Sequence, residues 1–138
     1  MTVMARGAGD GPFPTEVEIR GFRLLADEPG GTGGTDRGPS PYELLLAALG
    51  TCIVMTVRYH AERRGWPLDS VTVTLDHDRI HAKDCAECMT KEGRLDRIKR
   101  RVELIGALDE TQRAQLLEIA DRCPVHRTLT SETVIADL

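Results

Sequence analysis

The stretch that decides the fold runs from residue 40 to residue 64 and reads SPYELLLAALGTCIVMTVRYHAERR. Ser40 is a good helix N-cap, and Pro41 suits the first helical position. Glu43 stands where a capping box places a carboxylate. Gly65 follows the last polar turn, where a glycine commonly ends a helix. These signals predict one continuous helix across the whole stretch.

The middle of this predicted helix is uncharged. No charged residue occurs from Leu44 to Val57, and a helix that is apolar all round must be buried all round. That apolar run is too short to span a bilayer. From Pro41 to Arg64 the helix measures about 36 Å, which is about the diameter of a domain of this size. We therefore expect a homodimer in which two such helices cover each other.

The segments around the long helix predict strands and one shorter helix. Val17 and Ile19 alternate with charged residues, as in a strand that has one buried and one solvent-exposed face. Asp109 begins a second capping box, which predicts a helix to about Arg122. The glycine-rich stretch 27–39 is read as a loop. The predicted strands are Thr2–Ala5, Phe13–Arg20, Phe22–Ala26, Val71–Ile80, Leu95–Ile105 and Thr133–Asp137.

Composition narrows the class of protein. The 138 residues are 41% hydrophobic and 29% charged, which predicts one soluble globular domain over residues 1–138. The net charge of −4 argues against a nucleic-acid or anionic-membrane partner, because phosphate binding needs a basic face. Met1–Pro14 lacks the apolar core of a signal peptide, so we expect a cytoplasmic protein. There cysteines are more often reactive or metal-binding than structural disulfides.

Two of the four cysteines lie in apolar sequence, and each has two interpretations. Cys52 is either a small core residue or a reactive thiol. Cys123 precedes Pro124 and is expected at a helix N-cap, where backbone N–H groups favour a thiolate and lower its pKa. Packing in the core explains Cys123 equally well. His126 is one turn later and is a candidate partner of the thiolate, whereas His60 is expected to face solvent.

The other two cysteines form the sequence Cys85-Ala86-Glu87-Cys88 in a polar loop. No helical pattern follows them, as it would at a thioredoxin-like site. A zinc site would need further ligands, for which His77 and His81 are candidates. A second redox relay, a metal site and two exposed thiols therefore all remain open. No Gly-x-Ser-x-Gly motif is present, which argues against a serine hydrolase.

Two longer motifs resemble one known family. They are GPSPYELLLAALGTC at residues 38–52 and IADRCPVHRTL at residues 119–129. Both resemble the OsmC/Ohr family of osmotically inducible and organic hydroperoxide resistance proteins, and the resemblance covers essentially the whole chain. With DCAEC at residues 84–88, the chain looks most like a separate OsmC-like branch. The resemblance implies an α+β fold in which antiparallel sheets wrap long central helices in an intertwined homodimer.

The family resemblance also implies a thiol-dependent peroxidase for organic hydroperoxides, with a role in oxidative or osmotic stress defence. By position, Cys52 would be the peroxidatic cysteine and Cys123 the resolving one. Peroxide would oxidise Cys52 to a sulfenic acid, Cys123 would form a disulfide with it, and an external dithiol would reduce that disulfide. No cofactor and no metal are implied.

The chain departs from the family pattern at two places. Well-known members have Glu directly after the helix-start Pro, whereas Tyr42 occupies that position here and Glu43 follows it. A capping box explains Glu43 without any catalytic role. Those members also hold the thiolate with an early arginine. The candidates for that arginine are Arg6, Arg20, Arg23 and Arg37.

Two other functions compete with the peroxidase. One is an OsmC-like binding module whose apolar cleft holds a small hydrophobic ligand without any chemistry. The other is a metal-binding or redox-sensing protein that uses Cys85 and Cys88. Oxidation of Cys52 and Cys123 by peroxide would favour the enzyme, and bound zinc that depends on Cys85 would favour the sensor.

Overall fold

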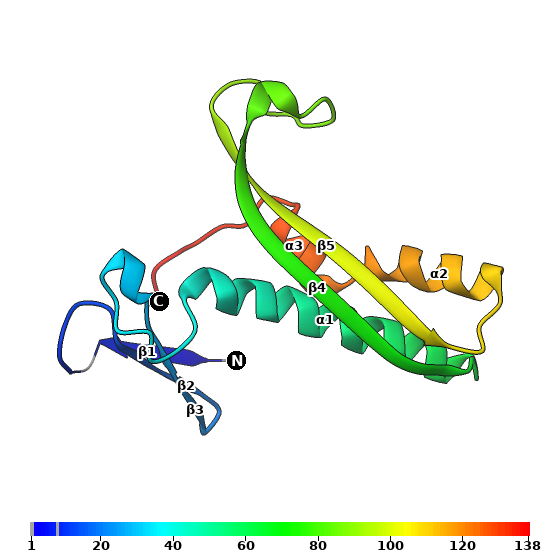
Figure 1. Cartoon of the computed structure of the whole chain (residues 1–138), viewed down its shortest axis with the longest axis horizontal. Coiled ribbons are helices and arrows are strands. Elements are labelled where there is room, and N and C mark those ends of the chain that lie inside the picture. Colours follow the sequence, from blue (N-terminus) through cyan, green and yellow to red (C-terminus); the bar gives the residue numbers. More distant parts are fainter. Residues whose placement is uncertain (1, 8) are drawn as a thin grey trace. The chain divides into compact units, whose positions relative to one another are not determined.

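The computed structural model describes residues 2–7 and 9–138, which form two compact units, residues 1–45 and 46–138. Each unit is described by itself. Both combine helical with antiparallel strand segments, so the α+β class predicted from the sequence is confirmed (Figure 1).

The first unit contains a three-stranded antiparallel sheet. Its strands are β1 (Val3–Gly7), β2 (Thr15–Ile19) and β3 (Phe22–Ala26), in that spatial order. Arg20 and Gly21 alone connect β2 to β3, with φ angles of 50° and 89°. Two consecutive positive φ values are typical of the type I′ turn, whose twist matches that of the two strands. The predicted strands are therefore confirmed, with ends shifted by one or two residues.

A buried carboxylate organises the glycine-rich loop that follows β3. Asp27 accepts hydrogen bonds from the backbone N–H groups of Glu28, Thr35 and Arg37 and from the Thr35 hydroxyl. The hydroxyl bond contributes most to lowering the pKa of Asp27, and burial opposes it. The short 3-10 helix η1 (Gly30–Thr32) lies inside this loop. The stretch read as a flexible connection is thus folded around one aspartate.

The long helix α1 (Pro41–Arg63) is confirmed almost to the residue. The capping box is formed, because Glu43 accepts from the Ser40 N–H at 2.7 Å and its own N–H donates to Ser40 Oγ at 3.3 Å. The buried positions follow one stripe at every fourth residue, as a helix with one covered face requires. They are Leu49, Ile53, Val57 and Ala61.

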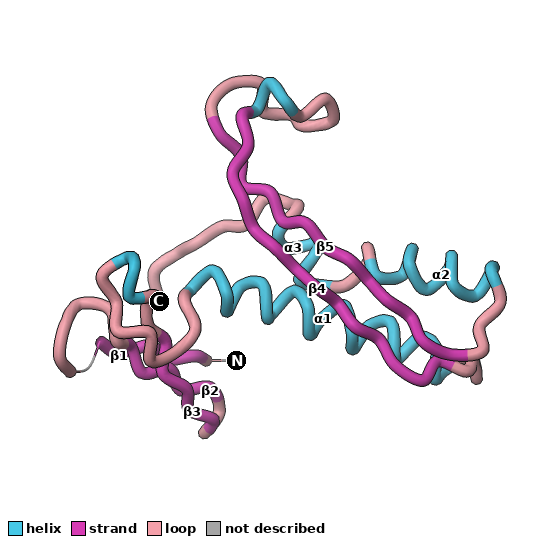
Figure 2. The backbone as a smooth tube through the Cα atoms, in the orientation of Figure 1, coloured by secondary structure: helices cyan, strands magenta, loops and turns pink. Residues whose placement is uncertain are grey.

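A long antiparallel hairpin, β4 (Leu68–His81) and β5 (Arg94–Gly106), lies along this helix in the second unit (Figure 2). Its inner face contributes apolar side chains to the core, including Val71, Val73 and Ile98. The loop at its far end contains the short 3-10 helix η2 (Ala82–Asp84). The polar segment predicted as a loop is therefore confirmed.

Two short helices complete the core. The helix α2 (Glu110–Ala120) begins with the predicted capping box, in which Asp109 and Gln112 each accept from the other's backbone N–H. It is followed by α3 (Pro124–Leu129). The core joins the α1 stripe, the inner face of the hairpin and three buried α2 residues, Leu116, Ile119 and Ala120.

The strand predicted at Thr133–Asp137 is wrong. Residues 131–138 adopt no regular structure, and Val134 and Ile135 are exposed at 82% and 95%. A strand needs a neighbouring strand edge to satisfy its backbone groups. Within the described chain, no strand pairs with this segment.

The expectation that α1 is buried all round is also wrong for the single chain. Met55 is 69% exposed, and an apolar groove of about 410 Å³ runs beside it. The groove is lined by Leu46, Ala47, Gly50, Thr51, Val54, Met55, Val73 and Leu75. By length and hydropathy the whole helix α1 would suffice to cross a membrane, although the sequence analysis judged its uncharged middle, Leu44 to Val57, too short to do so. Its buried stripe identifies it instead as the core helix of this unit.

Shortening one buried side chain of α2 tests this description of the core. Leu116→Ala removes a fully buried side chain, so we expect the free energy of unfolding to fall by about 2–5 kcal/mol. Leu117→Ala, at the adjacent and 43% exposed position, is the matched control and should cost far less. Urea unfolding followed by circular dichroism measures both. Equal losses in the two variants would contradict the assignment of the core.

Candidate active site

Cys123 occupies the position that the sequence predicted for it. It is the N-cap of α3, with Pro124 in the first helical turn, and the backbone N–H of His126 donates to its Sγ at 3.3 Å. Its side chain is fully buried in the core. The position of Cys123 at a helix N-cap and its packing in the core are therefore both confirmed, whereas its reactivity stays a prediction.

Cys52 lies next to Cys123. It is half-buried on α1 between the stripe residues Leu49 and Ile53, and it packs against the core cluster that contains Cys123. The Cys52 side chain lies close enough to the Cys123 thiol to raise its pKa. Both cysteines are free thiols. The structure thus brings together two sulfurs that are far apart in the sequence.

The predicted lowering of the Cys123 pKa is wrong. Burial raises the pKa of the Cys123 thiol, and the neighbouring Cys52 raises it further. The hydrogen bond from the His126 N–H acts in the opposite direction, as the sequence suggested, but is outweighed. Cys123 is therefore a protonated thiol at neutral pH and a poor nucleophile in its resting state.

Arg100 holds the turn that carries Cys123, and the sequence interpretation missed it. Its guanidinium donates to the Ala120 carbonyl at 3.3 Å and forms an ion pair with Asp121, at the end of α2. Arg100 points inward on β5, between the apolar positions of Ile98 and Val102. A charged residue at an inward position of an alternating strand was the signal that could have revealed it.

A small pocket lies near the helix turns that carry the two cysteines, and neither cysteine lines it. It measures about 280 Å³, and its lining includes Leu49, one turn before Cys52, and His126, one turn after Cys123. The remaining lining residues are Asp96, Ile98, Arg100, Leu129 and Thr130. His60 lies two turns beyond Cys52 on α1, with its ring edge-on to that of Tyr59. Of these two histidines, His126 is therefore the one at the site.

The candidate arginines and Glu43 belong to the unit of residues 1–45. Three of the arginines, Arg6, Arg23 and Arg37, line one hollow of about 410 Å³ on that unit's sheet. Arg20 stands apart in the β2–β3 turn, over the ring of Phe22. The carboxylate of Glu43 accepts the Ser40 N–H in the capping box, which is the non-catalytic role considered for it.

Cys85 and Cys88 are bonded to each other, with their Cα atoms 5.5 Å apart. The interpretation as two exposed thiols is therefore wrong for this structure. Within residues 2–7 and 9–138, no three His, Cys, Asp or Glu side chains gather as a metal site requires. The candidate zinc ligand His77 instead contacts Asp96, with Nε2 and Oδ1 3.0 Å apart.

Several solved structures share this fold. The OsmC like protein from Mycoplasma pneumoniae is 21% identical, with a TM-score of 0.73, 93% of this chain covered and 85% of that one. An organic hydroperoxide resistance protein OsmC from Legionella pneumophila is 18% identical, with a TM-score of 0.66 and coverages of 94% and 90%. An organic hydroperoxide resistance protein from Elizabethkingia anophelis is 16% identical, with a TM-score of 0.64 and coverages of 93% and 86%.

No curated protein sequence matches this chain significantly. A family model described as OsmC-like protein, however, matches residues 33–136, which include all four cysteines. The match covers well over half of the sequence, and the solved structures agree with it in fold. The chain therefore belongs to the OsmC-like protein family.

Proposed function

We propose that this protein is a thiol-dependent peroxidase that reduces organic hydroperoxides in oxidative or osmotic stress defence. The observation that carries the proposal is the packing of two free cysteines, Cys52 and Cys123, in one apolar core. The OsmC/Ohr family includes organic hydroperoxide resistance proteins, which makes peroxide chemistry the natural use of such a pair.

The different surroundings of the two thiols support different roles. Cys52 is half-buried and accessible from outside, so it is the sulfur that a peroxide reaches. Cys123 is fully buried and kept protonated by burial, so it does not compete for the peroxide. Cys52 is therefore assigned as the peroxidatic cysteine and Cys123 as the resolving one.

The cycle follows from these roles. The Cys52 thiolate attacks one oxygen of the peroxide, the O–O bond breaks, and the alkoxide takes a proton and leaves as an alcohol. The resulting sulfenic acid is attacked by the sulfur of Cys123, which gives up its proton as water leaves and a disulfide forms. An external dithiol supplies two electrons and two protons to restore both thiols.

An alkyl peroxide suits this environment better than hydrogen peroxide. The core around the two cysteines is aliphatic, with Leu49, Ile53 and Leu116 among its buried residues. An alkyl group gains free energy by leaving water for such surroundings. The chain is proposed to work as a single cytoplasmic domain.

The apolar groove also supports the proposed intertwined homodimer. Leu46, Val54 and Met55 present an aliphatic surface that the chain's own residues leave open. A second α1 laid against this surface would complete the burial that an uncharged helix requires.

Loss of either cysteine tests the peroxidase. We expect Cys52→Ser to lower the rate of cumene hydroperoxide reduction with a dithiol donor at least ~100-fold, because the nucleophile is removed. Cys123→Ser should instead accumulate a sulfenic acid on Cys52, visible as the mass of one added oxygen. Both are best made in a Cys85→Ser/Cys88→Ser background, so that every mass change belongs to the pair. A Cys52→Ser protein with undiminished activity would contradict the proposal.

Arg100 provides a test of how Cys123 is positioned. Arg100→Gln removes the guanidinium contacts with Ala120 and Asp121, so we expect the sulfenic acid to form at the normal rate but the disulfide to form several-fold more slowly. Trapping the sulfenic acid with dimedone after a single turnover measures the fraction of Cys52 that has been oxidised but has not yet formed the disulfide. Arg101→Gln, on the opposite face of β5 and largely exposed, is the matched control. Equal trapping in both variants would exclude this role for Arg100.

The dimer is tested by placing a charge on the open face of α1. We expect the parent protein to sediment as a dimer and Met55→Glu to sediment as a monomer, because a carboxylate cannot be buried there without a partner. Met89→Glu, at the 97% exposed end of the hairpin, is the matched control and should remain dimeric. A parent protein that is monomeric at every concentration, or a dimeric Met55→Glu, would refute the assembly.

A further inference from the structure

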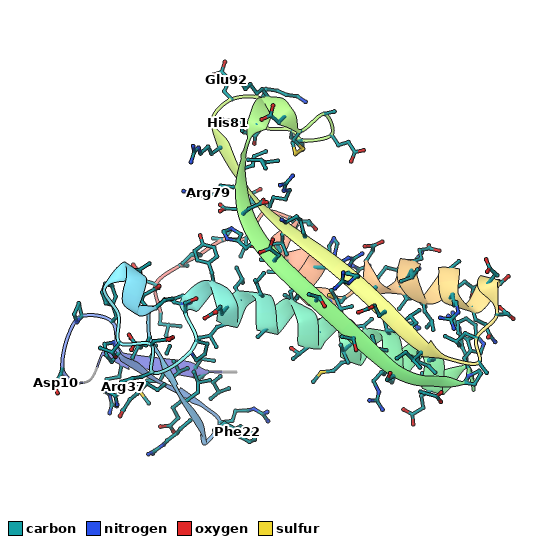
Figure 3. The ribbon with its side chains drawn as sticks, viewed as in Figure 1. Asp10, Phe22, Arg37, Arg79, His81 and Glu92 are labelled. Carbon is teal, nitrogen blue, oxygen red and sulfur yellow. A yellow bond between two sulfur atoms is a disulfide. The ribbon has the colours of Figure 1, made fainter. Side chains whose placement is uncertain are left out.

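The loop that carries Cys85 and Cys88 lies outside the core. It comprises residues 82–93, which include Glu92, and joins β4 to β5 at the end of the hairpin, beyond Arg79 and His81 (Figure 3). Ala82 is the one buried residue within it, and every other residue is half-buried or exposed. The loop thus makes no contribution to the core that a disulfide would be needed to protect.

The disulfide is also not needed to close the loop. Strand pairing continues up to His81 and Arg94, and the Ala82 N–H donates to the Gly93 carbonyl at 2.8 Å. The bridge joins two residues only three positions apart inside a loop that is already closed. A disulfide restricts the unfolded chain less when it encloses fewer residues. A structural role therefore explains this bridge poorly.

The two sulfurs are placed for exchange instead. An attacking thiolate must approach a disulfide sulfur from outside, and exchange rates depend on that access. Cys85 and Cys88 are both half-buried, while their neighbours Ala86, Glu87 and Met89 are exposed. A thiol of another molecule can reach this bridge without any opening of the fold.

The loop is separate from the cysteine pair of the core. Leu75 is the last β4 residue that packs against the core cluster, and the strand ends six positions later at His81. At about 3.3 Å per residue, this places the loop roughly 20 Å farther along the hairpin. Cys85 and Cys88 therefore cannot serve as the resolving partners of Cys52 within one chain.

We propose that Cys85 and Cys88 form a second redox centre, a thiol–disulfide exchange site whose substrate is an external dithiol. A thiolate of the dithiol attacks one sulfur of the bridge to form a mixed disulfide and releases the other as a thiolate. The second thiol of the substrate then displaces the remaining loop sulfur and closes the substrate's own disulfide. The dithiol loses two electrons and two protons, and the loop gains both as two cysteine thiols.

The test uses a full-length variant that lacks the core pair, Cys52→Ser/Cys123→Ser, so its outcome is independent of the proposed peroxidase. The folded protein is equilibrated with mixtures of reduced and oxidised dithiothreitol without denaturant, quenched with acid and alkylated. We expect its mass to gain two alkyl groups on reduction and none after return to oxidised dithiothreitol. The variant that also carries Cys85→Ser/Cys88→Ser is the matched control and should gain none in either state. Peptide mapping of the parent protein repeats the measurement should the variant fold poorly.

Reduction should leave the fold intact. We expect the thermal unfolding midpoint to change by less than about 2 °C, which is the shift that a small loss of stability produces in a domain of this size. Three results would overturn the proposal. They are a bridge that reduces only in denaturant, a midpoint that falls by more than about 5 °C on reduction, and a reduced protein that binds zinc stoichiometrically through the loop.

Discussion

The burial of α1 is the constraint on which the rest of the structure depends. This helix is apolar on every side over its middle turns, and its own chain covers one stripe, Leu49 to Ala61, with the hairpin and α2. The same packing fixes Cys52 against the end of α2, where the chain turns into α3. The position of the cysteine pair thus follows from the way in which this apolar helix is buried.

Burial also divides the chemistry between the two thiols. A helix N-cap favours a thiolate, but at Cys123 the loss of solvent outweighs the hydrogen bonds from the backbone N–H groups of Val125 and His126, so its pKa rises. In the proposed peroxidase cycle, Cys123 stays protonated and reacts only after Cys52 has been oxidised to an electrophilic sulfenic acid. Arg100 on β5 contacts Ala120 and Asp121 and so holds the turn that carries Cys123. Two cysteines in one core therefore need not be equivalent.

Local signals in the sequence predicted the local structure well. Capping boxes at Ser40 and Asp109 and the Cys123-Pro124 step located three helix starts, because caps depend on near neighbours only. The predictions that were wrong depend on contacts between residues far apart in the sequence. The segment 133–137 has a strand pattern but no partner edge in its own chain, and the pKa of Cys123 depends on burial that no local motif encodes. Inward-pointing Arg100 was visible as a break in the alternation of β5, but its partner on α2 was not.

The measurement that tests the central claim most directly is a peptide map of the parent protein after one equivalent of cumene hydroperoxide. The account predicts that the peptides containing Cys52 and Cys123 are recovered joined by a disulfide in nearly stoichiometric yield, and that a dithiol separates them again. Recovery of both peptides with free, alkylated thiols would contradict it, because the half-buried Cys52 and the buried thiol beside it would then have no part in peroxide reduction.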